Sequence, residues 1–158
     1  MASSREYPER PLVGVGGVII EGGRALLIRR GSEPLLGEWS IPGGTLELGE
    51  TLEQGVAREL LEETGLTVRV LELIEVFDRI YVESTAGAGK KGPRFHYVIV
   101  DYLCERIEGE AVAGSDVTEV AFAGEEELGP YRLTETATRI LRKAFAMERS
   151  RRGKPEKR

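Results

Sequence analysis

The chain of 158 residues carries 27 acidic residues against 22 lysines and arginines, a formal net charge of -5. This length favours one domain with its own buried core, and the acidic balance argues against a general affinity for nucleic acid. A single cysteine, Cys104, excludes an internal disulfide and a cysteine-rich zinc site, and it suits a cytoplasmic protein. The longest apolar run, residues 13–20, is short and interrupted by glycine, so neither a signal peptide nor a membrane span is predicted.

The hydrophobic pattern predicts strands interrupted by two helices. Short apolar runs rich in β-branched residues are typical of strands, and apolar residues at i, i+3, i+4 are typical of helices. In chain order we expect strands at 12–21, 24–30 and 38–41, a helix at 52–64, strands at 68–82, 95–104 and 117–122, and a helix that begins at Thr134. Gly22-Gly23 is a two-residue hairpin signal, which makes the first two strands antiparallel. This order predicts an α/β fold, a mixed sheet covered on both faces.

The chain shows neither repeats nor an internal linker, so we expect one domain at residues 11–147. Residues 1–10 form a polar N-terminal extension in this division. Residues 148–158 are locally basic and are predicted to be a flexible tail, with binding to nucleic acid or to an anionic surface as the alternative.

The helix predicted at 52–64 has clear end signals. Thr51 with Gln54 three residues later matches a capping box, and Gly65 is a typical stop. Its apolar residues recur at helical spacing and predict one side that docks on a sheet. They are Leu52, Val56, Ala57, Leu60 and Leu61.

The opposite side of this helix carries three carboxylates. Glu59, Glu62 and Glu63 lie at offsets of three and four, so their side chains share one arc and repel each other. Such a cluster must splay into water, take up protons, or bind a hard cation that prefers carboxylate oxygens. A solvated surface helix is the simpler alternative. Arg58 lies four residues before Glu62 and one turn from the loop with Glu50, so it can bridge helix and loop.

Residues 44–66 read GTLELGETLEQGVARELLEETGL and fit G-x5-E-x7-R-E-U-x-E-E-x-G-U, with U apolar, at every fixed position. The segment resembles the Nudix box, the signature of Mg2+-dependent hydrolases that cut a diphosphate linked to a nucleoside or similar group. The segments G-V-I-I, L-L-I-R-R and W-S-I-P-G-G also look similar to this family. The resemblance implies a Nudix-type α/β/α sandwich, with Mg2+ as cofactor and Mn2+ as a substitute.

The resemblance also implies roles for individual residues. It implies catalytic roles for Arg58, Glu59 and Glu62. It implies metal ligation by Glu59, Glu62, Glu63 and the carbonyl oxygen of Gly43. Glu62 is a further ligand or the residue that orients the attacking water.

Three residues before the box are candidates for substrate contacts. Arg29 and Arg30 end a predicted strand, and a guanidinium there can bind phosphate in bidentate fashion, although alternation turns one of them to solvent. Trp39 can stack on a base or belong to the core. The loop at 83–94, with Lys90 and Lys91, is either a lid over phosphates or a hairpin tip.

Three acidic residues outside the predicted metal cluster are further candidates for the substrate site. Glu47 can reach a ligand or water, or lie exposed in a turn. Asp116 and Glu119 are candidates for the general base or for recognition of the nucleobase, with a surface position as the alternative.

The function implied is Mg2+-dependent hydrolysis of a diphosphate linkage in a nucleoside diphosphate derivative, with ADP-ribose or a nucleotide sugar favoured. Hydrolysis of (d)NTPs is the close enzymatic alternative, because the box does not distinguish these substrates. Some ADP-ribose-cleaving relatives carry a proline beyond the box. Here Val82 lies near the place of that proline, and the next proline in the chain is Pro93. A non-catalytic nucleotide sensor and an isomerase that uses Cys104 are minor alternatives. The expected partner is a small nucleotide, not a membrane or nucleic acid, and dimers among relatives suggest a homodimer.

Overall fold

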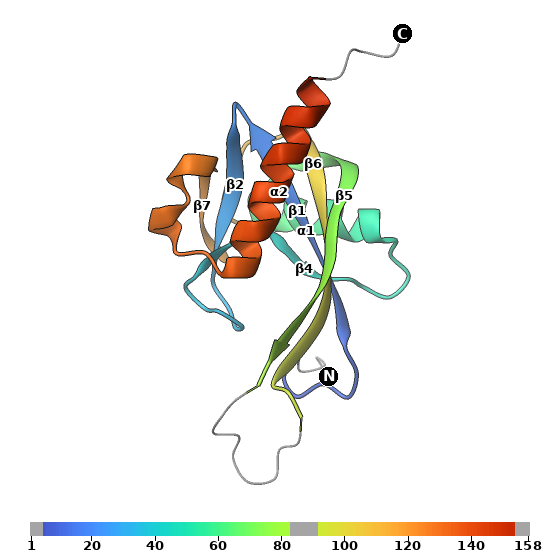
Figure 1. The fold of residues 1–158 in the computed structure, drawn as a ribbon. Helices are drawn as coiled ribbons and strands as arrows, with labels where there is room; N and C mark the ends of the chain where they lie inside the picture. Colours follow the sequence, from blue (N-terminus) through green and yellow to red (C-terminus); the bar gives the residue numbers. More distant parts are fainter. Residues whose placement is uncertain (1–4, 83–91, 154–158) are drawn as a thin grey trace.

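The computed structural model describes residues 5–82 and 92–153, so the lid hypothesis for Lys90 and Lys91 falls outside the described residues. Figure 1 shows the order of the elements. Their bounds are β1 Leu12–Glu21, β2 Arg24–Arg30, β3 Trp39–Ser40, β4 Gly43–Thr45, α1 Leu52–Thr64, β5 Thr67–Tyr81, β6 Phe95–Glu108, β7 Val117–Gly124, two 3-10 turns at Glu125–Glu127 and Gly129–Tyr131, and α2 Glu135–Arg152.

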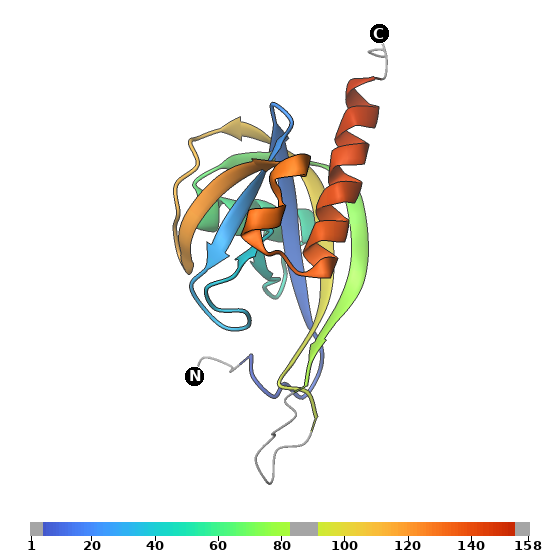
Figure 2. The same cartoon turned by 60° about the vertical axis from the view of Figure 1, so that its left-hand side comes forward.

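The sheet is mixed and runs in the order β3-β2-β1-β6-β5, with β4 on β1 and β7 on β2. Strands β1 and β6 are parallel, and the other pairs are antiparallel. β1 and β2 pair only next to their hairpin, at Ile20 with Ala25 and Glu21 with Arg24. Beyond that point β1 pairs with β4, while β2 pairs with β3 and β7. The sheet therefore divides into two halves that diverge from one hairpin, as Figure 2 shows.

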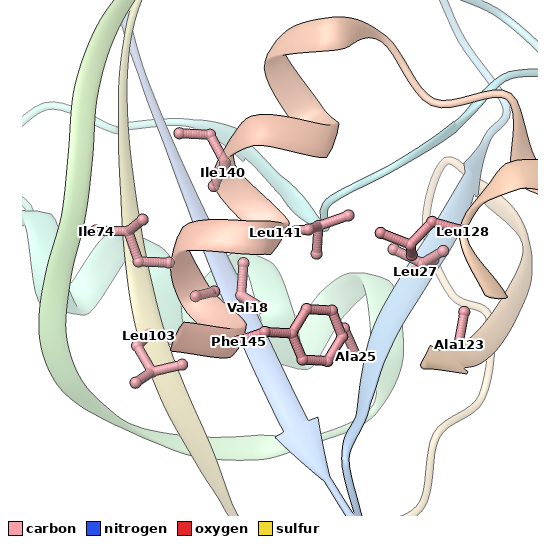
Figure 3. Packing of buried hydrophobic residues seen from close by; sticks show 11 residues of the cluster. Val18, Ala25, Leu27, Ile74, Leu103, Ala123, Leu128, Ile140, Leu141 and Phe145 are labelled. Carbon is pink, nitrogen blue, oxygen red and sulfur yellow. The ribbon is translucent and has the colours of Figure 1, made fainter. Parts of the chain in front are cut away.

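The two long helices cover opposite faces of the sheet (Figure 1). On one face, α2 inserts Ile140, Leu141 and Phe145 against Val18 and Leu103 (Figure 3). On the other face, α1 packs through a second buried cluster that includes Val15, Ile19, Leu26, Val56, Leu60 and Leu66. The predicted α/β/α arrangement is confirmed.

Helix α1 has the predicted bounds, because its end signals act as expected. The Thr51 side chain accepts a hydrogen bond from the Gln54 amide, and the Gln54 side chain accepts one from the Thr51 amide. Gly65 ends the helix in the left-handed conformation. Close packing also places the helix, since a Cβ atom at Gly55 would lie 2.7 Å from Leu46 Cδ1. Both ends of the helix that carries the acidic residues are therefore fixed.

The main differences from the sequence prediction concern β4, β6 and α2. The sequence does not predict strand β4 at Gly43–Thr45, because two consecutive glycines are typical of turns. Strand β6 continues to Glu108 rather than ending at Cys104. Helix α2 continues to Arg152, so residues 148–152 of the expected tail are helical, and Arg149 pairs with Glu125 at 3.1 Å.

No helix in the ranges 5–82 and 92–153 is long and apolar enough to cross a membrane.

Candidate metal and substrate site

Arg58 connects α1 to the loop before it, as the sequence predicts. Its Nε and Nη2 atoms donate to both oxygens of Glu50, at 2.6 and 2.9 Å. Its Nη2 also donates to the carbonyl oxygen of Thr45 at 3.1 Å, and its Nη1 donates to Glu59 at 2.8 Å. The hydrogen bond from Arg58 lowers the pKa of Glu50 to about 2 and keeps it charged. One guanidinium thus orients the loop, the end of β4 and Glu59.

The side chains of Glu59 and Glu63 point from α1 toward strand β4. They are 9% and 7% exposed. The Gly43 amide donates to Glu63 Oε1 at 3.0 Å. A Cβ atom at Gly44 would lie 2.4 Å from Glu59 Oε2, so only glycine leaves this space to the carboxylate. The two glycines therefore belong to the site as much as the two acids do.

Both buried acids resist ionisation. Burial raises the pKa of Glu63 to about 8, although the hydrogen bond from Gly43 acts in the opposite direction. Burial also raises the pKa of Glu59, against the hydrogen bond from Arg58. The charge of Glu59 also raises the pKa of Glu63, and the charge of Glu62 raises the pKa of Glu59, because like charges repel. The pair therefore favours a proton or a cation as a third partner.

The donor atoms around this pair fit a hard divalent cation, which prefers oxygen ligands. Glu59 and Glu63 supply carboxylate oxygens. Thr45 lines the same pocket, and its buried hydroxyl oxygen has no hydrogen-bond partner among the described residues. An unpartnered buried hydroxyl is unusual and is explained if a ligand or metal-bound water completes it.

Glu62 does not join the other two acids. Its side chain is 47% exposed and lies 3.3 Å from Arg58 Nη1. Within the described part of the chain no group of three potential metal ligands converges. Glu62 therefore lies apart from the buried pair and against Arg58, and its ligation of a metal stays a prediction.

The pocket extends from Glu59 and Glu63 across the divergence of β1 and β2, with Asp116 also in its lining. Arg30 lines it, and its Nε donates to the Pro34 carbonyl at 2.5 Å. Burial lowers the pKa of Arg30, and the charge of Glu63 raises it, so the two groups are electrostatically coupled across the pocket. Arg30 and Asp116 therefore line the same pocket as the acid pair, and their contact with a substrate stays a prediction.

Other predicted contacts lie elsewhere. Arg29 faces away and pairs with Glu119 at 3.0 Å, so neither of the two lines the pocket. Trp39 makes an edge-to-face contact with Tyr131, with ring centroids 5.0 Å apart, and packs on the core of α2. Glu47 is exposed, with a carboxylate oxygen 3.7 Å from Arg58. Arg29 and Glu119 thus lie at the surface, and Trp39 belongs to the core. Glu47 lies in an exposed turn. These positions match the alternatives to direct substrate contact.

Sequence reasoning missed several residues of the pocket. Arg79, Tyr97 and Asp101 line it from β5 and β6, and Arg5 lines it from the segment before β1. Asp101 could have been identified as a candidate from the sequence, because it is the only charged residue in the predicted strand FHYVIVDYLC. The lone cysteine is not part of the lining. It lies in the core on the α1 side, and burial raises its pKa to about 12.

The chain is similar to known proteins over most of its length. The NUDIX domain family model matches residues 10–144. An ADP-ribose pyrophosphatase of Methanocaldococcus jannaschii is 37% identical over 71% of this chain and 61% of its own length, so the chain spans less than two thirds of that relative. A MutT-like protein of Streptomyces ambofaciens is 37% identical over 89% of this chain and 83% of its own. A MutT NUDIX hydrolase of Burkholderia pseudomallei has a similar structure, with a TM-score of 0.71, 30% identity and coverage of 85% and 98%. The chain belongs to the Nudix hydrolase family.

Proposed function

We propose that this protein hydrolyses the diphosphate linkage of a nucleoside diphosphate derivative, ADP-ribose or a nucleotide sugar, with Mg2+ as cofactor and Mn2+ as a substitute. The observation that carries the proposal is the buried pair of Glu59 and Glu63 at Gly43 and Gly44, in one pocket with Arg30. A diphosphate is anionic, so an acidic site needs a cation between the two.

Glu59, Glu63 and the carbonyl oxygen of Gly43 would hold the metal in this proposal. A bound divalent cation supplies charge neutralisation at the phosphates and lowers the pKa of water. The chain supplies the positions. Arg58 fixes Glu59, the Gly43 amide fixes Glu63, and both acids would bind the cation in their ionised form.

Two further residues act on the reacting groups. Arg30 faces Glu63 across the pocket and binds phosphate oxygens with the donors that Pro34 leaves free. Glu62 remains partly exposed next to Arg58, where its carboxylate orients the attacking water. Asp116 is the alternative candidate for the general base, because it lines the pocket near Glu63. Burial and the charge of Glu59 raise the pKa of Glu63 most, and the charge of Asp116 adds a smaller increase.

The test is a panel of ADP-ribose, nucleotide sugars, dinucleoside polyphosphates and (d)NTPs with Mg2+ or with chelator, with products identified by mass. We expect hydrolysis that requires the metal and that falls by orders of magnitude in Glu63→Gln. Glu53→Gln is the matched control, since Glu53 is exposed in the first turn of the same helix. Equal turnover of the wild type and Glu63→Gln would overturn the proposal.

The (d)NTP alternative is decided by the same panel, because preference for triphosphates over ADP-ribose would select it. A folded, metal-binding protein that binds nucleotides without turnover would select the sensor. The cytoplasmic location and the homodimer remain predictions.

A further inference from the structure

Asp101 is a buried acidic residue that has no role in the reaction proposed above. It lies on β6 between Ile99 and Leu103 on the face toward α2, and it is 4% exposed. Its side chain lines the pocket. Among the described residues, no donor forms a hydrogen bond or an ion pair with it. Neither of its oxygens is among the fully enclosed atoms that lack a partner, so the carboxyl group is open to the pocket. A carboxyl group with so little exposure needs a donor from a ligand or from water in that pocket.

Gly16 shows that space is kept for this carboxyl group. Gly16 on β1 pairs with Asp101 across the parallel ladder. A Cβ atom at Gly16 would lie 2.3 Å from Asp101 Oδ1 and 3.1 Å from the carbonyl oxygen of Pro42. The carboxyl group therefore extends over β1, where Gly16 also lines the pocket.

Part of the neighbouring wall is apolar, although Arg79 also lines it. Phe77, Ile99 and Ile140 line the same pocket from β5, β6 and α2. Burial raises the pKa of Asp101 to about 7, while the charge of Arg79 lowers it and that of Glu75 raises it. A phosphate would be repelled by a carboxylate. A flat neutral ring with N–H groups on its edge fits both the walls and the acceptor.

We propose that Asp101 is a specificity-determining residue that accepts a hydrogen bond from the exocyclic amino group of the substrate's nucleobase. The inference rests on the proposed function in one respect, because it assigns the nucleoside to the same pocket. The ring packs between the apolar side chains, and the phosphates lie toward Arg30 and the acid pair. Ribose hydroxyl groups are also donors, but they lack the flat apolar faces that these walls fit.

Binding without divalent metal tests this assignment separately from hydrolysis. Titrations followed by calorimetry or amide NMR compare AMP with purine riboside 5′-monophosphate, and GMP with IMP, since each second nucleotide lacks an exocyclic amino group. Ribose 5-phosphate serves as the probe without a base. We expect the wild type to prefer the amino nucleotide of at least one pair by about ten-fold or more.

Asp101→Leu removes the acceptor at similar size, and we expect it to abolish this preference while ribose 5-phosphate binds as before. Asp78→Asn is the control, because Asp78 is exposed on the same hairpin of β5 and β6. Equal binding within both pairs by the wild type would overturn the proposal without any variant. Retained preference in Asp101→Leu, or an equal loss for ribose 5-phosphate, would also overturn it. Loss of hydrolysis in the presence of a normal preference would count against the proposed function alone.

Discussion

The amide of Gly43 donates a 3.0 Å hydrogen bond to Oε1 of Glu63 and so joins strand β4 to the last turn of α1. One helical turn before Glu63, the carboxylate of Glu59 occupies the space that a side chain at Gly44 would fill. The metal-site hypothesis therefore depends on two consecutive residues without side chains, and this dependence can be tested.

Gly44→Ala should remove activity with little loss of stability. The new Cβ atom would meet the carboxylate of Glu59, at 2.4 Å from Oε2, and the flexible end of that side chain can move away. We expect unfolding free energy to fall by about 1 kcal/mol and hydrolysis by about 100-fold. Gly43→Ala is the contrasting variant, because its Cβ atom would lie 2.2 Å from the Val15 carbonyl oxygen. It should lose about 2–3 kcal/mol in urea unfolding, and equal stability of the two variants would contradict this account.

Arg30→Ala should raise KM far more than Arg29→Ala does. Arg30 lines the pocket, whereas its neighbour pairs with Glu119 outside it. Loss of charge-assisted hydrogen bonds to phosphate weakens binding by about 10–100-fold. Steady-state kinetics of both variants provide the measurement. A comparable rise in KM for both would show that Arg30 does not contact the substrate.

Arg58→Lys should lower kcat/KM by about 10–100-fold even though the charge is kept. The guanidinium binds Glu50 through two nitrogens and also reaches Glu59 and Thr45, a geometry that an ammonium group cannot reproduce. Kinetics and titration with Mg2+ should show weaker metal binding in the variant. Unchanged metal affinity would assign Arg58 to stability rather than to the site.

Glu62→Gln should lower turnover by about 10²- to 10⁴-fold and leave the fold intact. The side chain is half exposed and contributes one long ion pair to Arg58, so its charge adds little to stability. Turnover with Mg2+ and a melting curve are the two measurements, with Glu53→Gln as the control. A variant with full turnover would remove Glu62 from the mechanism.

Asp101→Asn should gain stability relative to the wild type as pH rises. Burial raises the folded pKa of Asp101 from an ordinary value near 3.8 to about 7. Its favourable contribution is complete below the unfolded pKa and is lost as pH rises through the folded one. Between pH 5 and 8 the wild type should lose up to about 3 kcal/mol relative to the variant. Urea unfolding without divalent metal measures this difference, and parallel pH profiles would contradict the raised pKa.

The sequence predicts those parts of the molecule that local chemistry decides. The bounds of α1 follow from Thr51, Gln54 and Gly65, which act within a few residues of the helix ends. The bridge from Arg58 to Glu50 follows from helical spacing and charge. The direction of Arg29 and Arg30 was half predictable, because alternation separates them but does not say which one faces the pocket.

Long-range pairing explains what the sequence does not predict. Strand β4 exists because Gly43 and Gly44 pair with β1, and two glycines alone indicate a turn. Glu62 turns to Arg58 instead of the other acids, which helical spacing alone cannot decide. Asp101 gains its place in the pocket from the parallel pairing of β1 with β6, strands far apart in the sequence.

The divergence of β1 from β2 distributes the site over two supports. Glu59 and Glu63 rest on α1, β1 and β4, whereas Arg30 and Asp116 belong to β2 and the approach to β7. Only one hairpin joins these supports along β1 and β2. Substitutions in β2 or in the segment before β7 can therefore change the width or the lining of the pocket and admit different substrates. The geometry of Glu59 and Glu63 on the other support is retained.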